Sequence, residues 1–309
     1  MSGHISVLLN ESIEGLNIKK DGIYVDATLG RAGHSSHILS QLSSKGKLYC
    51  FDKDIDAMEI SRQRLSAISP QFELIHSDFS NMKEELLKRG VDSVDGILFD
   101  LGVSSPQLDN GERGFSYNYD ARLDMRMNKD DKLDAYTIVN TYSEDDLRKL
   151  IYTYGEERYA SLIARNIVES RATKKIETTF ELVDIIKLSV PTKYLKETHP
   201  AKRTFQAIRI EVNGELKDLK KAIFDAIDIL KDGGRLCIIT FHSLEDRAVK
   251  LAYADAQGKC TCPGDLPYCV CGVKSFGKII NKKPILPTKE EMAENSRSKS
   301  AKLRIFEKS

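Results

Sequence analysis

Four acidic residues stand at or just beyond the ends of short apolar segments in the first hundred residues. They are Asp26, Asp52, Asp78 and Asp100. If these segments are parallel strands of one sheet, their carboxyl ends meet at the edge where open α/β sheets bind ligands. Carboxylates gathered at that edge suit a ligand that offers hydroxyl, amino or cationic groups.

A turn rich in small residues follows Asp26. Residues 26–34 read Asp-Ala-Thr-Leu-Gly-Arg-Ala-Gly-His, and Gly30 and Gly33 allow a tight turn and a close approach of the backbone to a ligand. Asp52 lies about twenty residues beyond the turn, where an acidic residue can hold the hydroxyl groups of a ribose. This combination indicates a cofactor that contains a nucleoside.

Two features favour S-adenosylmethionine over a nicotinamide dinucleotide. We expect Asp26 at the mouth of the turn, where a carboxylate would repel a pyrophosphate but match a cationic amino group. The turn also departs from the G-x-G-x-x-G pattern, because Thr28 and Ala32 occupy two of its small-residue positions. Asp78 can accept a hydrogen bond from an adenine amino group. The alternative is that these acidic residues only cap helices.

Asp100 is the predicted catalytic residue, because the loop after the fourth strand should face the transferred methyl group. A carboxylate there suits methylation of nitrogen: it accepts hydrogen bonds from an exocyclic amino group and orients the lone pair for in-line attack. Enzymes that methylate carbon often carry a cysteine nucleophile in this region, and residues 100–106 contain none. The alternative for Asp100 is a cap of a helix or turn.

Basic and aromatic residues are candidates for contacts with a nucleic acid, since an extruded base needs stacking and its backbone needs cations. Stacking is assigned to Phe115, Tyr117 or Phe241, and His242 follows the same strand end without an assigned role. Ordinary core packing is the alternative for each ring. The candidate phosphate contacts are Arg113, Lys202, Arg203, Arg209, Arg247 and the basic C-terminal segment.

Charge is unevenly distributed along the 309 residues, whose net charge is +1. Residues 171–209 hold 9 basic and 4 acidic residues, and residues 274–309 hold 10 and 4, whereas residues 92–146 hold 5 and 13. The two basic zones permit contact with phosphates. No apolar run reaches the roughly 18 residues of a membrane span, and no secretory signal is visible, so we expect a cytoplasmic protein.

Four cysteines form two C-x-C pairs in a turn-rich loop, residues 260–271. Cys260, Cys262, Cys269 and Cys271 could together bind a structural zinc ion, although zinc sites more often use C-x-x-C pairs. Unmetallated thiols and a redox function are the alternatives.

Alternating strand and helix signals predict an α/β fold, a Rossmann-like sheet interrupted by an inserted all-helical domain. The expected strands are residues 23–28, 47–52, 72–76, 94–100, 235–241 and 302–306. The expected domains are residues 1–110 and 209–309 for the two parts of the sheet domain and 111–208 for the helical insertion. Apolar residues from Val212 to Leu230 lie on one stripe of a long helix that Gly233 and Gly234 should end.

Six blocks of sequence resemble the RsmH family, also called MraW, in order and over nearly the whole chain. They are residues 28–35, 100–109, 113–116, 203–213, 241–247 and 300–304. The resemblance implies a class I methyltransferase sheet with a helical insertion. It also implies methylation of the exocyclic N4 of a cytidine in the decoding centre of 16S rRNA, with the small (30S) ribosomal subunit as partner.

The resemblance places cofactor contacts on Ala32, Gly33, His34, Asp52, Phe79, Asp100 and Gln107. Asp26, Gly30 and Asp78 are added by the reasoning from the residues above. Ala32 departs from the family, where glycine is common, and its methyl group is tolerated if the backbone there is not left-handed.

Three other functions stay open on the sequence. The chain could methylate a different RNA or a protein, or it could be a non-catalytic RNA-binding protein of ribosome assembly. A nicotinamide-dependent oxidoreductase is the third. The sequence does not define the oligomeric state, monomer or homodimer.

Overall fold

A computed structural model describes residues 6–103, 107, 111–197, 199–258, 262 and 272–309. The chain forms two compact units. Unit 1 comprises Met1–Gly102 and Leu216–Ser309, and unit 2 comprises Val103–Glu215. The insertion expected at residues 111–208 lies inside unit 2, which extends further at both ends. Each unit is described by itself.

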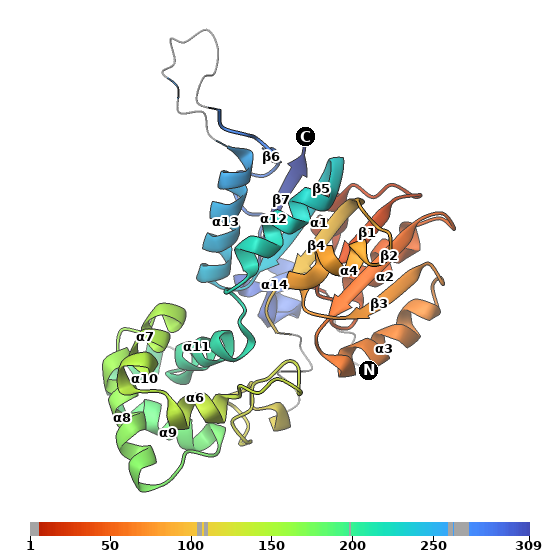
Figure 1. The fold of residues 1–309 in the computed structure, drawn as a ribbon. Helices are drawn as coiled ribbons and strands as arrows, with labels where there is room; N and C mark the ends of the chain where they lie inside the picture. Colours follow the sequence, from red (N-terminus) through yellow and green to blue (C-terminus); the bar gives the residue numbers. More distant parts are fainter. Residues whose placement is uncertain (1–5, 104–106, 108–110, 198, 259–261, 263–271) are drawn as a thin grey trace. The chain divides into compact units, whose positions relative to one another are not determined.

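Unit 1 is built on a seven-stranded sheet in the order β3-β2-β1-β4-β5-β7-β6 (Figure 1). The first five strands in this order are parallel, and β7 runs antiparallel to both of its neighbours. The strands are β1 Ile23–Asp26, β2 Lys47–Asp52, β3 Phe72–His76, β4 Val94–Asp100, β5 Leu230–Thr240, β6 Gly277–Ile279 and β7 Lys302–Lys308. The α/β prediction is confirmed.

Six of these strands were predicted from their apolar runs, and β6 was missed. It has three residues at the edge of the sheet, too few to show a periodic pattern. β5 begins at Leu230, earlier than expected, and its register with β4 is irregular between Val94 and Gly96.

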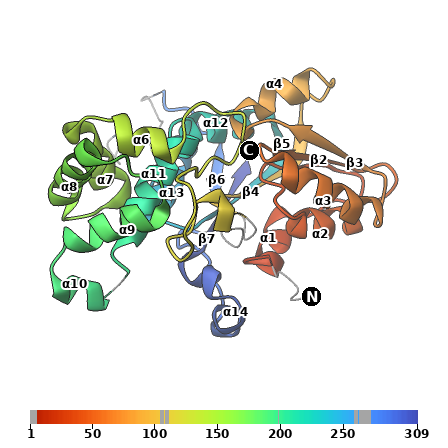
Figure 2. The same cartoon turned by 90° about the horizontal axis from the view of Figure 1, so that it is seen from below.

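Two layers of helices cover the two faces of the sheet (Figures 1 and 2). Because successive strand residues point to opposite faces, Ile97 and Phe99 pack with the first core and Leu98 with the second. The first core includes residues of α4 Met82–Leu87, α12 Leu219–Ile229 and α13 Ser243–Gln257; the second includes residues of α1 Leu9–Leu16, α2 Gly33–Gln41 and α3 Ile55–Ser66. Cys50 and Cys237 are buried in the second core.

The long helix expected over residues 212–230 is wrong. Gly214 has a left-handed backbone (φ 62°) and ends α11 Ala201–Asn213, and α12 starts only at Leu219. A glycine in this conformation caps a helix and stops its hydrogen-bond ladder. The break coincides with the border between the units, so the common apolar stripe belongs to two separate helices.

Unit 2 is helical, and its described residues contain one isolated strand-like bridge, between Arg122 and Thr178. Its helices are α6 Ala135–Thr141, α7 Glu144–Gly155, α8 Ala160–Thr173, α9 Thr179–Leu188, α10 Thr192–Glu197 and α11. The predicted N-cap Ser143 accepts a hydrogen bond from the backbone of Asp146. Unit 1 also contains three shorter elements, η1 Phe79–Asn81, α14 Lys289–Glu294 and η3 Ser296–Ser300. Unit 2 contains one, η2 Gly111–Arg113.

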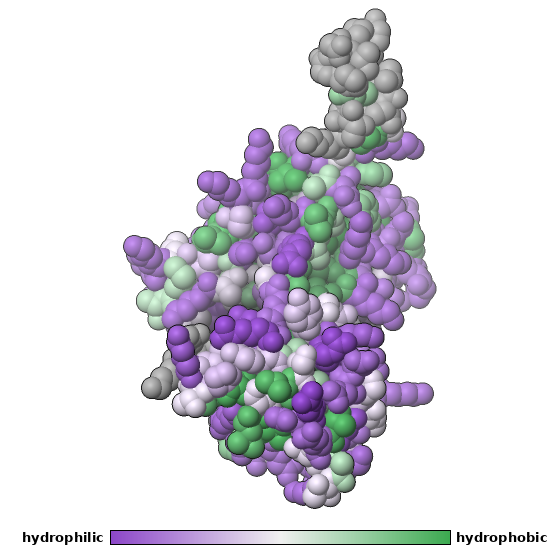
Figure 3. All heavy atoms as spheres, turned by 90° about the vertical axis from the view of Figure 1, so that its left-hand side faces the viewer, coloured by the Kyte–Doolittle hydropathy of each residue, from purple (hydrophilic) through white to green (hydrophobic). Residues whose placement is uncertain are grey.

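Hydrophilic side chains predominate on the face drawn in Figure 3, with separate apolar patches among them. Large hydrophobic residues exposed on unit 2 include Tyr152, Leu162, Phe180 and Leu188. Among the described residues, none of the helices has the length and apolarity that crossing a membrane requires.

The contact between Gly96 and Tyr24 provides a test of the packing beside the first strand. A Cβ at Gly96 would lie 2.7 Å from Cε1 of the fully buried Tyr24 ring. We expect Gly96→Ala to lower the free energy of unfolding by about 1–3 kcal/mol, because overpacking displaces the ring. Urea denaturation measures the loss. In the double variant Gly96→Ala/Tyr24→Leu the losses should be less than additive; additive losses would contradict the contact.

Candidate active site

The turn between β1 and α2 has two residues with left-handed backbones. Gly30 has φ 50°, and Ala32 has φ 57° and ψ 31°. The condition given above for tolerating the Ala32 methyl group, a backbone that is not left-handed, is therefore not met. An L-residue there costs roughly 1–2 kcal/mol, which the surrounding contacts must offset. Ala32 is fully buried, so its methyl group packs in the core in return.

Asp26 lies beneath this turn and not at its mouth. Only 1% of the residue is exposed, and its two carboxylate oxygens accept hydrogen bonds from the backbone of Thr28 (3.1 Å) and from Oγ of Ser35 (2.6 Å). Burial raises the pKa of its carboxyl group to about 6. Asp26 therefore shapes the turn from below, and its burial does not favour the predicted contact with a cationic amino group.

Asp52 connects the end of β2 to the glycine turn. Its Oδ2 accepts a hydrogen bond from the backbone of Gly30 (2.8 Å), and its Oδ1 accepts one from the backbone of Asp54 (2.8 Å). Burial raises the pKa of Asp52, while these two hydrogen bonds act in the opposite direction. An ionised carboxylate has about four acceptor positions, so two remain for the hydroxyl groups of a ribose.

Asp78 and Phe79 follow β3. Oδ1 of Asp78 caps η1 by accepting from the backbone of Ser80 (2.8 Å), and its Oδ2 lies 3.3 Å from Nζ of Lys53. Phe79 is partly buried and packs edge-on against Phe99 of β4, with ring centroids 5.4 Å apart. Asp78 thus has the capping role that the alternative interpretation assigned to it, and adenine recognition stays a prediction.

Asp100 ends β4 beside the glycine turn, and Thr28 fixes its backbone. The backbone N–H of Asp100 donates to Oγ1 of Thr28 (2.6 Å). Oδ1 of Asp100 is buried and has no hydrogen-bond partner among the described residues. Burial raises the pKa of this carboxyl group well above its usual range, and the charges of Asp26 and Glu245 raise it further. The sequence indicated Thr28 only as a departure from the glycine pattern, although a hydroxyl just after a strand that ends at a ligand site is a signal for this role.

His34 lies in the first turn of α2 and is 4% exposed. Its Nδ1 is 3.5 Å from Oδ2 of Asp100, and its Nε2 is 3.1 Å from the carbonyl oxygen of Val7. The preceding position, residue 33, requires a glycine, because a Cβ there would lie 1.7 Å from Oγ of Ser6. The segment before α1 therefore runs across the start of α2.

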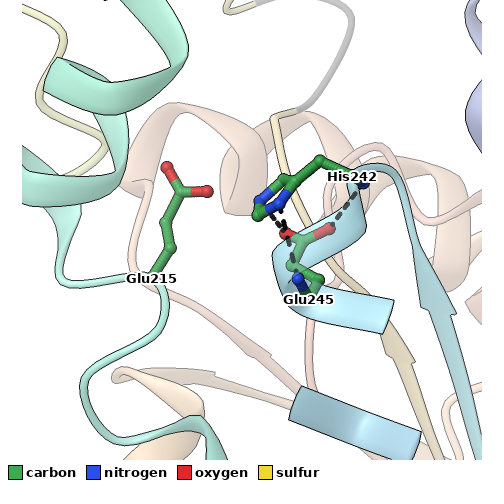
Figure 4. Close-up of side chains that lie close together, drawn as sticks. All are labelled: Glu215, His242 and Glu245. Atoms are coloured by element: carbon green, nitrogen blue, oxygen red, sulfur yellow. Dashed lines mark hydrogen bonds and ion pairs between the residues drawn. The ribbon is translucent and has the colours of Figure 1, made fainter. Parts of the chain in front are cut away.

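Phe241 and His242 follow β5. A Cβ at Gly102 (φ 94°) would lie 3.5 Å from Cδ2 of Phe241, so this partly exposed ring is adjacent to the loop after Asp100. His242 caps α13: its Nδ1 accepts from the backbone of Glu245, and its Nε2 lies 3.1 Å from Oε1 of Glu245 (Figure 4). The capping box gives His242 a positioning role, and Phe241 is the better placed ring for a substrate.

The donor set at the carboxyl ends of these strands fits S-adenosylmethionine. The space beside Gly30 is open. A Cβ at this position would have the carbonyl oxygen of Thr28, 4.0 Å away, as its nearest neighbour. Asp52 and Asp100 offer carboxylate oxygens, and a cationic sulfonium suits such an edge better than phosphates do. The side chain of Asp100 is 28% exposed, so its carboxylate is the acceptor that an amino group of a substrate could reach.

Comparison with known proteins decides the family. The family model described as MraW methylase family matches residues 1–309. The chain belongs to the MraW methylase family. It is therefore an S-adenosylmethionine-dependent methyltransferase, and the sheet of unit 1 is its class I methyltransferase sheet.

Relatives with high identity carry the name Ribosomal RNA small subunit methyltransferase H. The protein of that name from Clostridioides difficile (strain 630) is 56% identical over 306 residues, 99% of this chain and 98% of the relative. Those from Clostridium botulinum (strain Kyoto / Type A2) and Brevibacillus brevis (strain 47 / JCM 6285 / NBRC 100599) are 55% and 51% identical, again with 99% of this chain and 98% of each relative covered.

The arginines of unit 2 chosen as phosphate contacts have partners within that unit. Arg113 donates to the carbonyl oxygens of residues 126 and 127, Arg203 donates to that of Glu156, and Arg209 forms a bidentate pair with Glu215. Lys202 is exposed. The three arginines therefore stabilise the fold of unit 2, and phosphate binding by them stays a prediction. Lys202 is the candidate whose removal should disturb the structure least.

The two rings chosen in unit 2 pack inside it. Phe115 is 5% exposed in the core of this unit. Tyr117 stacks on His199 at 4.2 Å between centroids and meets Phe205 edge-on. The packing alternative therefore describes both rings.

Several predicted residues cannot be assigned to the site from the structure. Gln107 is buried in unit 2, and Arg247 is exposed on α13 of unit 1. Cys260, Cys269 and Cys271 lie outside the described residues, and Cys262 is described without the other three, so the zinc site stays a prediction.

The buried Asp26 makes stability depend on pH in a direction that can be tested. Its pKa is about 6 in the folded protein and about 3.9 in the unfolded chain, so its stabilising contribution is complete below pH 4 and disappears as pH rises through 6. From pH 4 to pH 7 the wild-type protein should lose about 2 kcal/mol relative to Asp26→Asn. Urea denaturation of both proteins measures this difference; a constant difference would show that Asp26 titrates normally.

Proposed function

We propose that this protein transfers a methyl group from S-adenosylmethionine to the exocyclic N4 of a cytidine in the decoding centre of 16S rRNA. The names of the relatives support rRNA of the small subunit as acceptor. The observation that supports nitrogen as the acceptor atom is the carboxylate of Asp100, whose side chain is 28% exposed at the end of β4 beside the cofactor turn. The acceptor is the small (30S) ribosomal subunit, and the protein acts in the cytoplasm.

Bound S-adenosylmethionine supplies an electrophilic methyl group on a sulfonium. Asp52 holds the ribose hydroxyl groups through the acceptor positions that Gly30 and Asp54 leave open. Phe79 would cover the adenine, and Asp78 would accept from its amino group. The turn from Gly30 to Gly33 lets the backbone approach the cofactor.

Asp100 prepares the acceptor nitrogen for attack. The lone pair of an exocyclic amino group is delocalised into the ring, which makes it a weak nucleophile. A hydrogen bond from this group to the Asp100 carboxylate would turn the lone pair toward the methyl carbon, and the amino proton would then have a carboxylate within reach. The hydrogen bond from Asp100 to Thr28 holds the carboxylate's backbone in place for this step. Phe241 stacks on the base.

A different acceptor is the second candidate. The carboxylate geometry suits any exocyclic or amide nitrogen, so another RNA or a protein could take the methyl group. A non-catalytic role in ribosome assembly would leave the carboxylate unused. Methylation of small subunits that lack the modification, followed by nucleoside analysis, separates the three: label in N4-methylcytidine supports the proposal, and its absence with cofactor binding intact contradicts it.

Removal of the Asp100 carboxylate should abolish turnover even when the cofactor is saturating. We expect Asp100→Ala to lower the rate of methyl transfer by at least about 100-fold at saturating S-adenosylmethionine, since proton acceptors contribute 10²–10⁴. Single-turnover transfer to small subunits measures the rate, and calorimetry measures cofactor affinity. Asp92→Ala, at an exposed position before β4, is the matched control. A wild-type rate in Asp100→Ala would exclude the role.

A phosphate contact of Lys202 should appear in the salt dependence of RNA binding. We expect Lys202→Ala to weaken binding and to reduce the slope of log Kd against log salt by about one phosphate charge, roughly 0.7–0.9. Filter binding to a 16S rRNA fragment at several salt concentrations provides both values. Lys45→Ala, an exposed lysine before β2, should leave the slope unchanged. Equal slopes for Lys202→Ala and wild type would remove Lys202 from the interface.

A further inference from the structure

Arg158 is an exposed arginine of unit 2 whose guanidinium group contacts two tyrosine rings. It lies in the short segment between α7 and α8. Its Cζ is 4.9 Å from the ring centroid of Tyr159 and 4.8 Å from that of Tyr194, within the roughly 6 Å of a cation–π contact. The two rings meet edge-on, with centroids 5.2 Å apart. These contacts hold the long arginine side chain in position before any ligand binds.

A buried carboxylate fixes the two rings. Glu157 is 0% exposed; its Oε2 accepts a hydrogen bond from the hydroxyl of Tyr194 (2.6 Å), and its Oε1 accepts one from the backbone N–H of Tyr159 (2.9 Å). Burial and the hydrogen bond to Glu157 raise the pKa of Tyr194 to about 12, so this hydroxyl stays protonated and donates at neutral pH. Both rings are therefore held from inside unit 2, and Arg158 lies against a surface that is already fixed.

The donors of Arg158 are not used within the protein. Among the described residues, none forms a hydrogen bond or an ion pair with this guanidinium, which carries five N–H groups. Arg148, an exposed arginine of the neighbouring α7, differs in this respect because it pairs with Asp145 at 3.0 Å. The tyrosine contacts thus order the Arg158 side chain and leave its donors available to an anion.

The backbone before Arg158 has an uncommon conformation. Glu156 ends α7 with φ 48° and ψ 38°, the left-handed region that residues other than glycine rarely adopt. Two side chains of α11 support it: Nη1 of Arg203 donates to the carbonyl oxygen of Glu156, and Nε2 of Gln206 donates to that of Tyr154 (3.0 Å). Such conformations persist where the surrounding contacts impose them, and they are frequent at ligand clamps. The segment that carries Arg158 is therefore a fixed support for a ligand contact.

Arg203 brings a second guanidinium to the same tyrosine. Burial has the largest influence on the pKa of Tyr194, but the positive charges of Arg203 and Arg158 both act to lower it, which places both cations near this ring. Arg203 is exposed, and its bond to a carbonyl oxygen leaves other N–H groups of its guanidinium for a ligand. Two carboxylates, Glu156 and Glu157, belong to the same segment, and Glu157 already accepts from the tyrosines.

We propose that Arg158, held against Tyr159 and Tyr194, forms with Arg203 a binding site for a phosphate of an RNA backbone. The proposal deepens the proposed function and rests on it for RNA as the source of the phosphate. Guanidinium groups bind phosphate oxygens through paired N–H donors, and stacking on aromatic faces is compatible with this use. Phosphate contacts fix the register of a protein on a nucleic acid without reading its sequence. The site therefore positions unit 2 on the RNA.

The salt dependence of RNA binding tests the site. The probe is a naked 16S rRNA fragment, whose anionic groups are phosphates, and filter binding of the full-length protein is measured from about 50 to 200 mM KCl. Arg158→Gln should weaken binding at least about tenfold, since it removes charge-assisted hydrogen bonds. It should also reduce the slope of log Kd against log salt by roughly 0.7–0.9.

Two further variants of unit 2 control this measurement. Arg148→Gln removes an exposed arginine that is already paired and should change neither the Kd nor the slope. Arg158→Lys should keep the slope, because the charge remains, but it should bind less tightly, because an ammonium group lacks the planar paired donors. If Arg158→Gln has the same Kd and slope as Arg148→Gln, the proposal is wrong.

The tyrosine contacts are tested by a variant that leaves every charge in place. Tyr159→Leu removes one ring from Arg158, so binding should weaken by about two- to fivefold while the slope stays as in wild type. Urea denaturation shows whether the variant is folded, and a wild-type Kd in folded Tyr159→Leu would contradict the clamp. If this variant does not fold, the Arg158 variants decide, because Arg158 is exposed and its replacement leaves the hydrogen bonds of Glu157 intact.

Methyl transfer to small subunits separates this site from the reaction. Arg158→Gln should raise the KM for subunits at least about tenfold and leave the single-turnover rate at saturating subunits within about twofold of wild type, since it removes binding only. A lower rate at saturation with an unchanged KM would exclude the binding role. A raised KM with unchanged binding of the fragment would assign Arg158 to a protein of the subunit and overturn the RNA site.

The outcome for the site and the outcome for the proposed function can be told apart. If wild-type protein does not methylate small subunits but Arg158→Gln still reduces the salt slope on the fragment, the proposed function fails and the phosphate site stands. If wild-type protein produces N4-methylcytidine and Arg158→Gln binds the fragment like wild type, the function stands and the site is overturned.

Discussion

The pairing of β1 with β4 is the constraint on which the site depends. These parallel neighbours place Asp26 opposite Leu98, so the glycine turn and Asp100 leave the sheet side by side. The backbone of Ala27 donates to the carbonyl oxygen of Leu98, and Asp100 donates to Thr28 one step further along. A slip of one residue would turn every side chain of β4 to the other face, where Ile97 and Phe99 would meet the core that now holds Leu98, so the packing of both cores also sets the geometry of the site.

Burial of the acidic residues of the site lowers the stability of the fold, but it also lets their hydrogen bonds define the shape of the turn. Ionised carboxylates in a core are unfavourable unless they are hydrogen-bonded or paired. Asp26 and Asp52 satisfy this with backbone and hydroxyl donors of the turn, and they thereby hold that turn in shape. Asp100 retains one buried oxygen that has no donor among the described residues, and burial raises the pKa of its carboxyl group accordingly.

The helical unit shows why cations are hard to assign from sequence. Arg113, Arg203 and Arg209 stand in motifs that suggest phosphate contacts, but their guanidinium groups reach carbonyl oxygens or a carboxylate of the same unit. A guanidinium has five donors, so it can support a fold and still face a ligand, and a linear sequence does not distinguish the two uses. Phe115 and Tyr117 illustrate the same difficulty for aromatic rings.

The sequence by itself determined the α/β class, six of the seven strands and the acidic residues at their ends, because periodic burial and strand-end positions are local properties. It also determined the helical insertion and the family. The tertiary structure alone decided that Asp26 lies under the turn, that Ala32 is left-handed and that the apolar stripe near residue 214 belongs to two helices. It also brought His34 to Asp100, whose residue numbers are 66 apart. Such facts depend on which strands become neighbours and on how much water the packing excludes, and neither is written in any local pattern.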